Sequence, residues 1–84
     1  MSKTDSPDKK ESKVQRKVFQ SSLLQSGVYN PERRELILEF VSGPVYAYSN
    51  FSPEAWVALN TAASPGSYFH QFIKPVFPGR RMDG

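Results

Sequence analysis

The sequence contains no cysteine and a single histidine, His70. Without cysteine, neither a disulfide framework nor a thiolate metal site can form. One histidine among scattered carboxylates offers neither the ligand spacing of a metal site nor the paired groups of acid–base catalysis. We therefore expect a protein that is not an enzyme and that uses no metal or other cofactor.

Long apolar runs are also missing. No stretch approaches the roughly 20 residues needed to span a bilayer, and the first residues, MSKTDSPDKKESK, have no apolar segment typical of a secretory signal. We expect a cytoplasmic protein with no membrane partner. The 84 residues allow only one small core, and a chain of this size can gain buried surface by forming a homo-oligomer.

The positive charge is unevenly distributed. The formal net charge is +3, and residues 1–20 carry six basic and three acidic side chains, whereas residues 21–84 carry five of each. The sequence therefore predicts a neutral folded part behind a basic segment. We expect this segment, residues 1–18, to be a disordered leader, because it is rich in Lys, Ser and Asp and has too few apolar groups to stabilise order.

The pattern of apolar residues predicts one domain over residues 19–81, followed by a polar tail at residues 82–84. Residues 21–29, residues 35–40 and the segment that contains Tyr46 and Tyr48 have the character of strands. Two short helices follow. We therefore expect an α+β fold of order β-β-β-α-α, a three-stranded antiparallel meander with both helices on one face. Residues 14–19 also alternate, which leaves a short additional strand open.

The loop between the second and third predicted strands decides where the two tyrosines point. A three-residue loop, Val41-Ser42-Gly43, places Leu38 opposite Tyr46 and both tyrosines on the apolar face. A two-residue loop would shift the register by one residue and turn both rings outward. We favour the first arrangement, because a type I turn followed by glycine in the left-handed region suits these residues.

Both predicted helices have a recognisable start. Ser52-Pro53-Glu54 combines an N-cap, a proline at the first helical position and an acid in the first turn. Ser64-Pro65-Gly66-Ser67 can end this helix and cap the next, which then ends at Lys74-Pro75. The predicted apolar stripes consist of Trp56, Val57, Leu59 and Ala63 in the first helix and of Tyr68, Phe69, Phe72 and Ile73 in the second.

Several short motifs follow one another along the chain. They are Ser21-Ser22, Gly27-Val28-Tyr29-Asn30, the strand from Leu36 to Phe40, Gly43, Tyr46-Ala47-Tyr48, and Ala63-Ser64-Pro65-Gly66-Ser67-Tyr68-Phe69 with Ile73. Taken in this order they resemble the KTSC domain family. The resemblance covers roughly Phe19 to Arg81, which is most of the chain outside the leader.

The resemblance implies a fold more than an activity. The KTSC family is named after the C-terminus of some lysyl-tRNA synthetases and also occurs as small stand-alone bacterial and phage proteins. It has no established activity, and RNA binding is suggested for it through its association with the synthetase. Members often have a basic residue between the two tyrosines, which fits a solvent-facing position there; this chain has Ala47 and thus one positive charge fewer on the sheet.

The candidate site residues are of the kinds that bind phosphate or stack on bases. Arginine pairs hold phosphate through bidentate geometry, a helix start offers backbone N–H groups to an anion, and aromatic rings stack on bases. The predicted nucleic-acid or phosphate-binding residues are Arg33, Arg34, Gly66, Ser67, His70, Lys74, Arg80 and Arg81, and the predicted stacking residues are Tyr46, Tyr48 and Tyr68. Core packing of the tyrosines, helix capping by serine and solvated surface charge are the simpler explanations.

These observations predict a small binding module for RNA or another phosphate-bearing ligand. In this hypothesis the basic leader attracts the nucleic-acid backbone, while Lys74, Arg80 and Arg81 gather beside the second helix and make the ordered contacts. The neutral folded part leaves two other classes open. One is a phage-type protein-interaction or inhibitor module that acts on a host protein, and the other is an oligomer that sequesters a small nucleotide at its interface.

Overall fold

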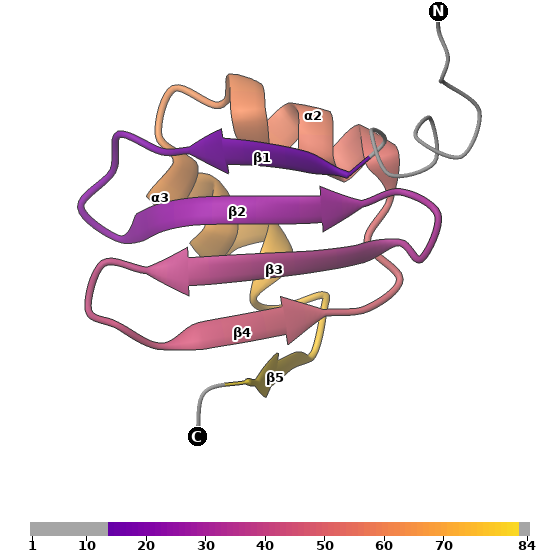
Figure 1. Ribbon diagram of the computed structural model, residues 1–84. Coiled ribbons are helices and arrows are strands. Elements are labelled where there is room, and N and C mark those ends of the chain that lie inside the picture. Colours follow the sequence, from indigo (N-terminus) through magenta and orange to yellow (C-terminus); the bar gives the residue numbers. More distant parts are fainter. Residues whose placement is uncertain (1–13, 83–84) are drawn as a thin grey trace, which may run out of the picture.

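A computed structural model describes residues 14–82, so most of the predicted leader and the last two residues of the tail lie outside the described part. Within these residues one antiparallel sheet has five strands in sequence order: β1 (Gln15–Val18), β2 (Leu24–Asn30), β3 (Glu35–Phe40), β4 (Val45–Tyr48) and β5 (Gly79–Arg81). The helices α2 (Pro53–Thr61) and α3 (Pro65–Tyr68) and the π-helix η1 (Phe69–Ile73) cover one face of it (Figure 1). The predicted α+β class is therefore confirmed.

The sheet has two more strands than the predicted three, one at each edge. β1 is the additional strand that the alternation of residues 14–19 left open, within the segment assigned to the leader, and β5 lies beyond the last predicted helix. The Trp56 Nε1–H holds β1 by donating to Gln15 Oε1 at 2.9 Å, and Phe19 is buried directly after the strand. The prediction of three strands is wrong because these two are only four and three residues long and depend on contacts far along the chain.

The added strand β1 also changes the charge of the folded part. It contains Arg16 and Lys17, so residues 14–82 carry seven basic and four acidic side chains rather than equal numbers. The prediction of a neutral folded part is therefore wrong. The excess positive charge extends into the sheet.

The hairpin between β3 and β4 has the predicted register. Leu38 pairs with Tyr46 and Leu36 pairs with Tyr48, which fixes a three-residue loop that ends at Gly43. Gly43 has φ +119°, a conformation that glycine adopts without strain. Both tyrosines consequently face the helices, where Tyr48 is 4% exposed and Tyr46 packs against the core.

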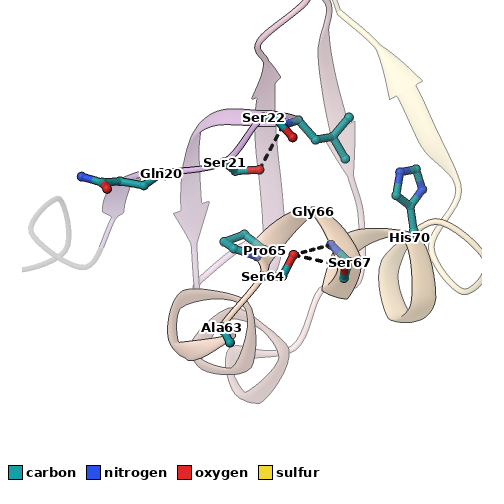
Figure 2. Close-up of a pocket in the computed structure, with 10 residues that line it drawn as sticks. Gln20, Ser21, Ser22, Ala63, Ser64, Pro65, Gly66, Ser67 and His70 are labelled. Atoms are coloured by element: carbon teal, nitrogen blue, oxygen red, sulfur yellow. Dashed lines mark hydrogen bonds between the residues drawn. The ribbon is translucent and has the colours of Figure 1, made fainter.

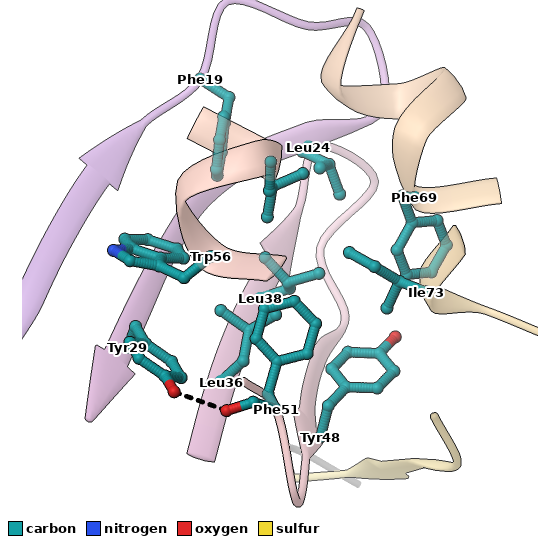
Figure 3. Close-up of a cluster of buried hydrophobic side chains, with 11 residues drawn as sticks. Phe19, Leu24, Tyr29, Leu36, Leu38, Tyr48, Phe51, Trp56, Phe69 and Ile73 are labelled. Carbon is teal, nitrogen blue, oxygen red and sulfur yellow. Dashed lines mark hydrogen bonds between the residues drawn. The ribbon is translucent and has the colours of Figure 1, made fainter. Parts of the chain in front are cut away.

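The core fills the space between the sheet and the helices (Figure 3). Its buried members are Phe19, Leu24, Tyr29, Leu36, Leu38, Tyr48, Phe51, Trp56, Leu59, Phe69 and Ile73. Trp56 stacks on Tyr29 with ring centroids 5.5 Å apart, and the Tyr29 hydroxyl donates to the carbonyl oxygen of Phe51. These contacts attach α2 and the segment before it to β2.

Both predicted helix starts are confirmed. Ser52 caps α2 by accepting the Ala55 N–H at 3.1 Å, and Ser64 caps α3 by accepting the Ser67 N–H at 3.3 Å. In α2 the buried residues are Trp56 and Leu59. Two members of the predicted stripe differ, since Val57 is 57% exposed and Ala63 lies beyond the end of the helix. In residues 14–82 no helix has both the length and the apolar character needed to cross a bilayer.

The second predicted helix changes its winding after Tyr68. The Lys74 N–H donates to the Phe69 carbonyl at 2.9 Å, a bond between residues five apart that defines a π-turn. This wider turn buries Phe69 and Ile73 and leaves Phe72 53% exposed. The prediction that Phe72 belongs to the buried face is therefore wrong, because it assumed regular α-helical spacing.

The middle position between the two tyrosines is less open than predicted. Ala47 does lie on the sheet face away from the helices, but only 1% of it is exposed. Its register partners on the two neighbouring strands are Ile37 and Arg80, which are larger and flank it on both sides. The small side chain is therefore covered by its neighbours.

Candidate functional site

Two adjoining pockets lie on the helical side of the sheet and share Leu23 and His70 among their lining residues. The first, of about 500 Å³, lies between the β1–β2 loop and the start of α3 (Figure 2). We call it the hydroxyl pocket, because Ser21, Ser22, Ser64 and Ser67 line it beside Gly66. The second, of about 360 Å³, is the aromatic pocket, lined by Phe40, Tyr46, Tyr48, Phe69 and Phe77 with Lys74. We refer to the two adjoining pockets together as the groove.

The β1–β2 loop gives the hydroxyl pocket its shape. Ser21 Oγ accepts the N–H groups of Leu23 at 3.0 Å and Leu24 at 3.2 Å, which makes a turn and moves the start of β2 from the predicted residue 21 to residue 24. A Cβ at Gly66 would lie 3.4 Å from Leu23 Cβ and 3.5 Å from Ser21 Oγ. The start of α3 therefore packs closely on this loop, and the pocket between them is preformed.

Capping accounts for most of the predicted anion site at the start of the second helix. Pro65 has no N–H, the Ser67 N–H donates to Ser64 Oγ, and the Tyr68 N–H donates to the Ser64 carbonyl at 3.0 Å. Of the first helical turn, this arrangement leaves the N–H of Gly66 for a ligand. Hydroxyl groups rather than backbone amides thus dominate the chemistry of this pocket.

Packed rings form the walls of the aromatic pocket. Tyr46 and Tyr48 stack with centroids 6.4 Å apart, Phe40 meets Tyr46 edge-on at 5.8 Å, and Phe69 meets Tyr48 edge-on at 6.0 Å. A Cβ at Gly79 would lie 2.7 Å from Tyr48 Cε1, so β5 can cross the tyrosines only with glycine there. The walls of this pocket are therefore mainly aromatic rings that pack on one another.

Burial of Tyr48 predicts a loss of stability at high pH. Its hydroxyl points toward Phe69 and Ile73 (Figure 3), and desolvation, with a smaller contribution from Tyr46, raises the pKa of Tyr48 from 10.0 to about 12. The unfolded chain therefore loses this proton at a lower pH than the folded chain does. Stability that is fully present below pH 10 should fall as the pH rises from 10 to about 12.

Thermal melts across this pH range, followed by circular dichroism, test the Tyr48 prediction. In Tyr48→Phe the decline of the melting temperature above pH 10 should become shallower. It should not vanish, because burial also raises the pKa of Tyr29. An identical decline in both proteins would contradict the assignment.

The structure brings together six of the predicted site residues in the groove. They are Tyr46, Tyr48, Gly66, Ser67, His70 and Lys74. His70 is exposed, packs on Phe69 with centroids 5.5 Å apart, and stands where the two pockets meet. Among residues 14–82 no cluster of three or more His, Cys, Asp or Glu side chains could hold a metal.

The remaining predicted site residues lie elsewhere. Arg33 and Arg34 belong to the turn between β2 and β3, and Tyr68 packs against Phe72 with centroids 4.9 Å apart. Lys74, Arg80 and Arg81 do not gather beside the second helix as predicted. Arg81 pairs with Tyr46 and is directed to the helical side, whereas Arg80 is directed to the opposite face, since successive residues of a strand alternate.

Sequence reasoning missed several residues that complete the groove. Ser21, Ser22 and Leu23 form one wall of the hydroxyl pocket, and Phe40 and Phe77 close the aromatic pocket. The Ser21-Ser22 pair did stand among the motifs of the family resemblance. Nothing in the local sequence indicated that this loop packs on Gly66, more than forty residues later.

Comparisons with known proteins agree with this architecture. The family model of the KTSC domain matches residues 20–77. An uncharacterized protein of Stutzerimonas stutzeri is 44% identical over 62 residues, which cover 74% of this chain and 87% of that protein. A crystal structure of a KTSC domain protein from Yersinia pestis superposes with a TM-score of 0.75 at 31% identity, covering 82% of this chain and 97% of that one.

Part of a larger enzyme is similar as well. A lysine–tRNA ligase of a Nostoc species is 38% identical over 58 residues, which cover 69% of this chain but only 10% of the ligase. The similarity thus concerns one segment of that enzyme, as it does in the ligase of Nostoc punctiforme, which is 34% identical over 58 residues. On the family match and the shared fold, this chain belongs to the KTSC domain family.

Proposed function

We propose that this chain is a non-catalytic module that binds single-stranded RNA, with one nucleotide seated in the groove. The observation that carries this proposal is the junction of the aromatic pocket with the hydroxyl pocket at His70, with Lys74 beside it. A nucleotide has the same two-part chemistry, an aromatic base joined to a polar sugar phosphate. Stacking of a base on an aromatic side chain contributes about 1–3 kcal/mol.

In this arrangement the base enters the aromatic pocket, where the partly exposed ring of Tyr46 is available for stacking. The ribose and phosphate lie toward Ser22 and Ser67, both exposed. Serine hydroxyls can donate to and accept from the ribose 2′-hydroxyl, which is the group that distinguishes RNA from DNA. The exposed ammonium group of Lys74 then lies within the reach of the phosphate.

Two further observations support RNA as the ligand. The described residues carry an excess of basic side chains, as a nucleic-acid partner requires. Three of the relatives are named as lysine–tRNA ligases, and a domain shared with enzymes of tRNA is consistent with contact to RNA. A binding role rather than catalysis is supported by the groove itself, whose one histidine stands beside a phenylalanine ring rather than beside an acid.

Fluorescence anisotropy of a labelled single-stranded RNA tests the proposal. The full chain should bind the RNA, and the logarithm of the association constant should fall linearly with the logarithm of the salt concentration. Lys74→Ala should weaken binding and reduce the magnitude of this slope by about one, because one phosphate contact is lost.

Arg33→Ala is the matched control. Arg33 is also an exposed cation but lies in the β2–β3 turn, outside the groove, so its loss should leave both the affinity and the slope nearly unchanged. Equal losses in the two variants would mean that diffuse charge binds the RNA, and the groove would be excluded. An intact chain that binds no RNA at low salt would refute the proposed function.

A further inference from the structure

The sheet face opposite the helices carries several apolar side chains among its polar and charged ones. An antiparallel sheet with one face in solvent normally has polar side chains on that face. Here no described helix covers the face, from which Figure 1 views the molecule. Its outward positions nevertheless include Val18, Val28, Ile37, Val45, Ala47 and Met82, and Val18 is 68% and Met82 51% exposed.

The charged residues of this face form a cross centred on Ile37. The register aligns Arg16, Val28, Ile37, Ala47 and Arg80 in one row across all five strands. With strands about 4.8 Å apart, each arginine backbone lies about 10 Å from that of Ile37, on opposite sides. Along β3, Glu35 and Glu39 lie two residues before and after Ile37, about 7 Å away in each direction. Arginines therefore occupy one arm of the cross and glutamates the perpendicular arm.

We propose that this face binds a second copy of the same chain, with the two sheets packed face to face and their strands crossing at nearly a right angle. When one copy is rotated by a quarter turn relative to the other, the arginine arm of each copy lies over the glutamate arm of its partner. A two-fold axis that lies in the interface, diagonal to the strands, makes this match in both directions, as a symmetric dimer requires. Ile37 then meets the partner's Ile37 at the centre.

Aligned packing of the two sheets is disfavoured by repulsion between like charges. With the strands of both copies parallel or antiparallel to one another, the two-fold axis would run along or across the strands. Either axis places the glutamates of β3 against glutamates of the partner's β3, and like charges in contact are destabilising. The positions of Arg16, Arg80, Glu35 and Glu39 thus select the perpendicular arrangement, while the apolar centre provides most of the affinity.

Contacts within one chain are compatible with this interface. Arg80 Nη2 lies 3.6 Å from Glu35 Oε2, with side chains 65% and 25% exposed, and exposed pairs of this kind contribute little. Both groups can therefore exchange partners across the dimer. The groove lies on the other side of the sheet, so two grooves remain open in the dimer and an RNA with two sites would gain affinity from both.

Sedimentation velocity of the full chain over a wide range of concentration tests the interface. The intact protein should reach the mass of a dimer. Ile37→Arg places like charges at the centre and should raise the dimer dissociation constant at least about tenfold, while Arg33→Glu, in the turn outside this face, should leave it unchanged. A chain that stays monomeric, or a dimer that survives Ile37→Arg in folded form, would overturn the proposal.

A charge exchange at the ends of the cross tests, independently of Ile37, whether these four charged side chains face each other across the interface. The variant Arg16→Glu with Arg80→Glu has an acidic cross, and the variant Glu35→Arg with Glu39→Arg has a basic one. Each should be monomeric alone, with a circular dichroism spectrum like that of the intact chain, and an equal mixture should form a dimer. A mixture of the folded variants that remains monomeric would contradict the perpendicular arrangement.

Discussion

Replacement of Trp56 by alanine should destabilise the domain by about 3–5 kcal/mol. Trp56 is 2% exposed, stacks on Tyr29 and donates its indole N–H to Gln15. The substitution therefore opens a cavity in the core and also removes the hydrogen bond that holds β1. Small domains have a free energy of unfolding of only about 5–15 kcal/mol in total. Much of the variant should therefore be unfolded at moderate temperature.

Urea denaturation followed by far-ultraviolet circular dichroism measures this loss without using the tryptophan as a probe. Val57→Ala is the matched control, because it shortens the next residue of the same helix at a side chain that is 57% exposed. It should change the free energy of unfolding by no more than about 0.5 kcal/mol. Similar losses in the two variants would show that α2 does not pack through Trp56.

Replacement of Gly27 by valine should destabilise the same region by overpacking. A Cβ at this position would lie 3.1 Å from Leu38 Cδ2 and from Phe19 Cε2, and 3.3 Å from Trp56 Cζ3. Valine adds two further carbons where three buried side chains already meet. Added methyl groups in a packed core typically cost about 1–3 kcal/mol, and here we expect the upper end of that range.

The same denaturation experiment tests the Gly27 prediction. Gln25→Val introduces the same side chain two residues earlier on β2, at an exposed position, and should have a small effect. Gly27→Ala should lie between the two. A stable Gly27→Val protein with an unchanged midpoint would mean that the space between β2 and α2 is larger than the structure shows.

The elements that could be predicted are those whose chemistry is local. The alternation of residues 35–40 defines β3, glycine at position 43 defines the loop length and hence the tyrosine register, and Ser52 and Ser64 mark the two helix starts. Each of these signals lies within a few residues of the structure it specifies. The same holds for the turn after β2, where Asn30 Oδ1 accepts the Glu32 N–H at 3.0 Å.

The sequence left the edge strand β1 open through the alternation of residues 14–19 and did not predict β5, because both strands depend on distant partners. Gln15 is held by a tryptophan 41 residues later, and Gly79 is required only because the ring of Tyr48 lies under it. For the same reason, the sequence predicted only part of the groove. Histidine, lysine and glycine near the second helix indicated a binding region, but only the fold places the β1–β2 loop against it.

Arg80 and Arg81 show how one strand that was not predicted leads to a wrong position for a predicted site. Because no strand was predicted at residues 79–81, Arg80 and Arg81 were expected to gather with Lys74 beside the second helix. As a strand, β5 directs them to opposite faces of the sheet. Arg80 thus belongs to the open face and its ion pair with Glu35 rather than to the groove.

Nuclear magnetic resonance of the full, ¹⁵N-labelled chain tests most directly whether RNA binds in the groove. Titration with a short single-stranded RNA should shift the backbone amides of Leu23, Gly66, His70 and Lys74, which line the two pockets. The amides of Val28 on the open face and of Arg33 in the distant turn should remain in place. Shifts confined to the open face, or to residues 1–13 alone, would contradict the account.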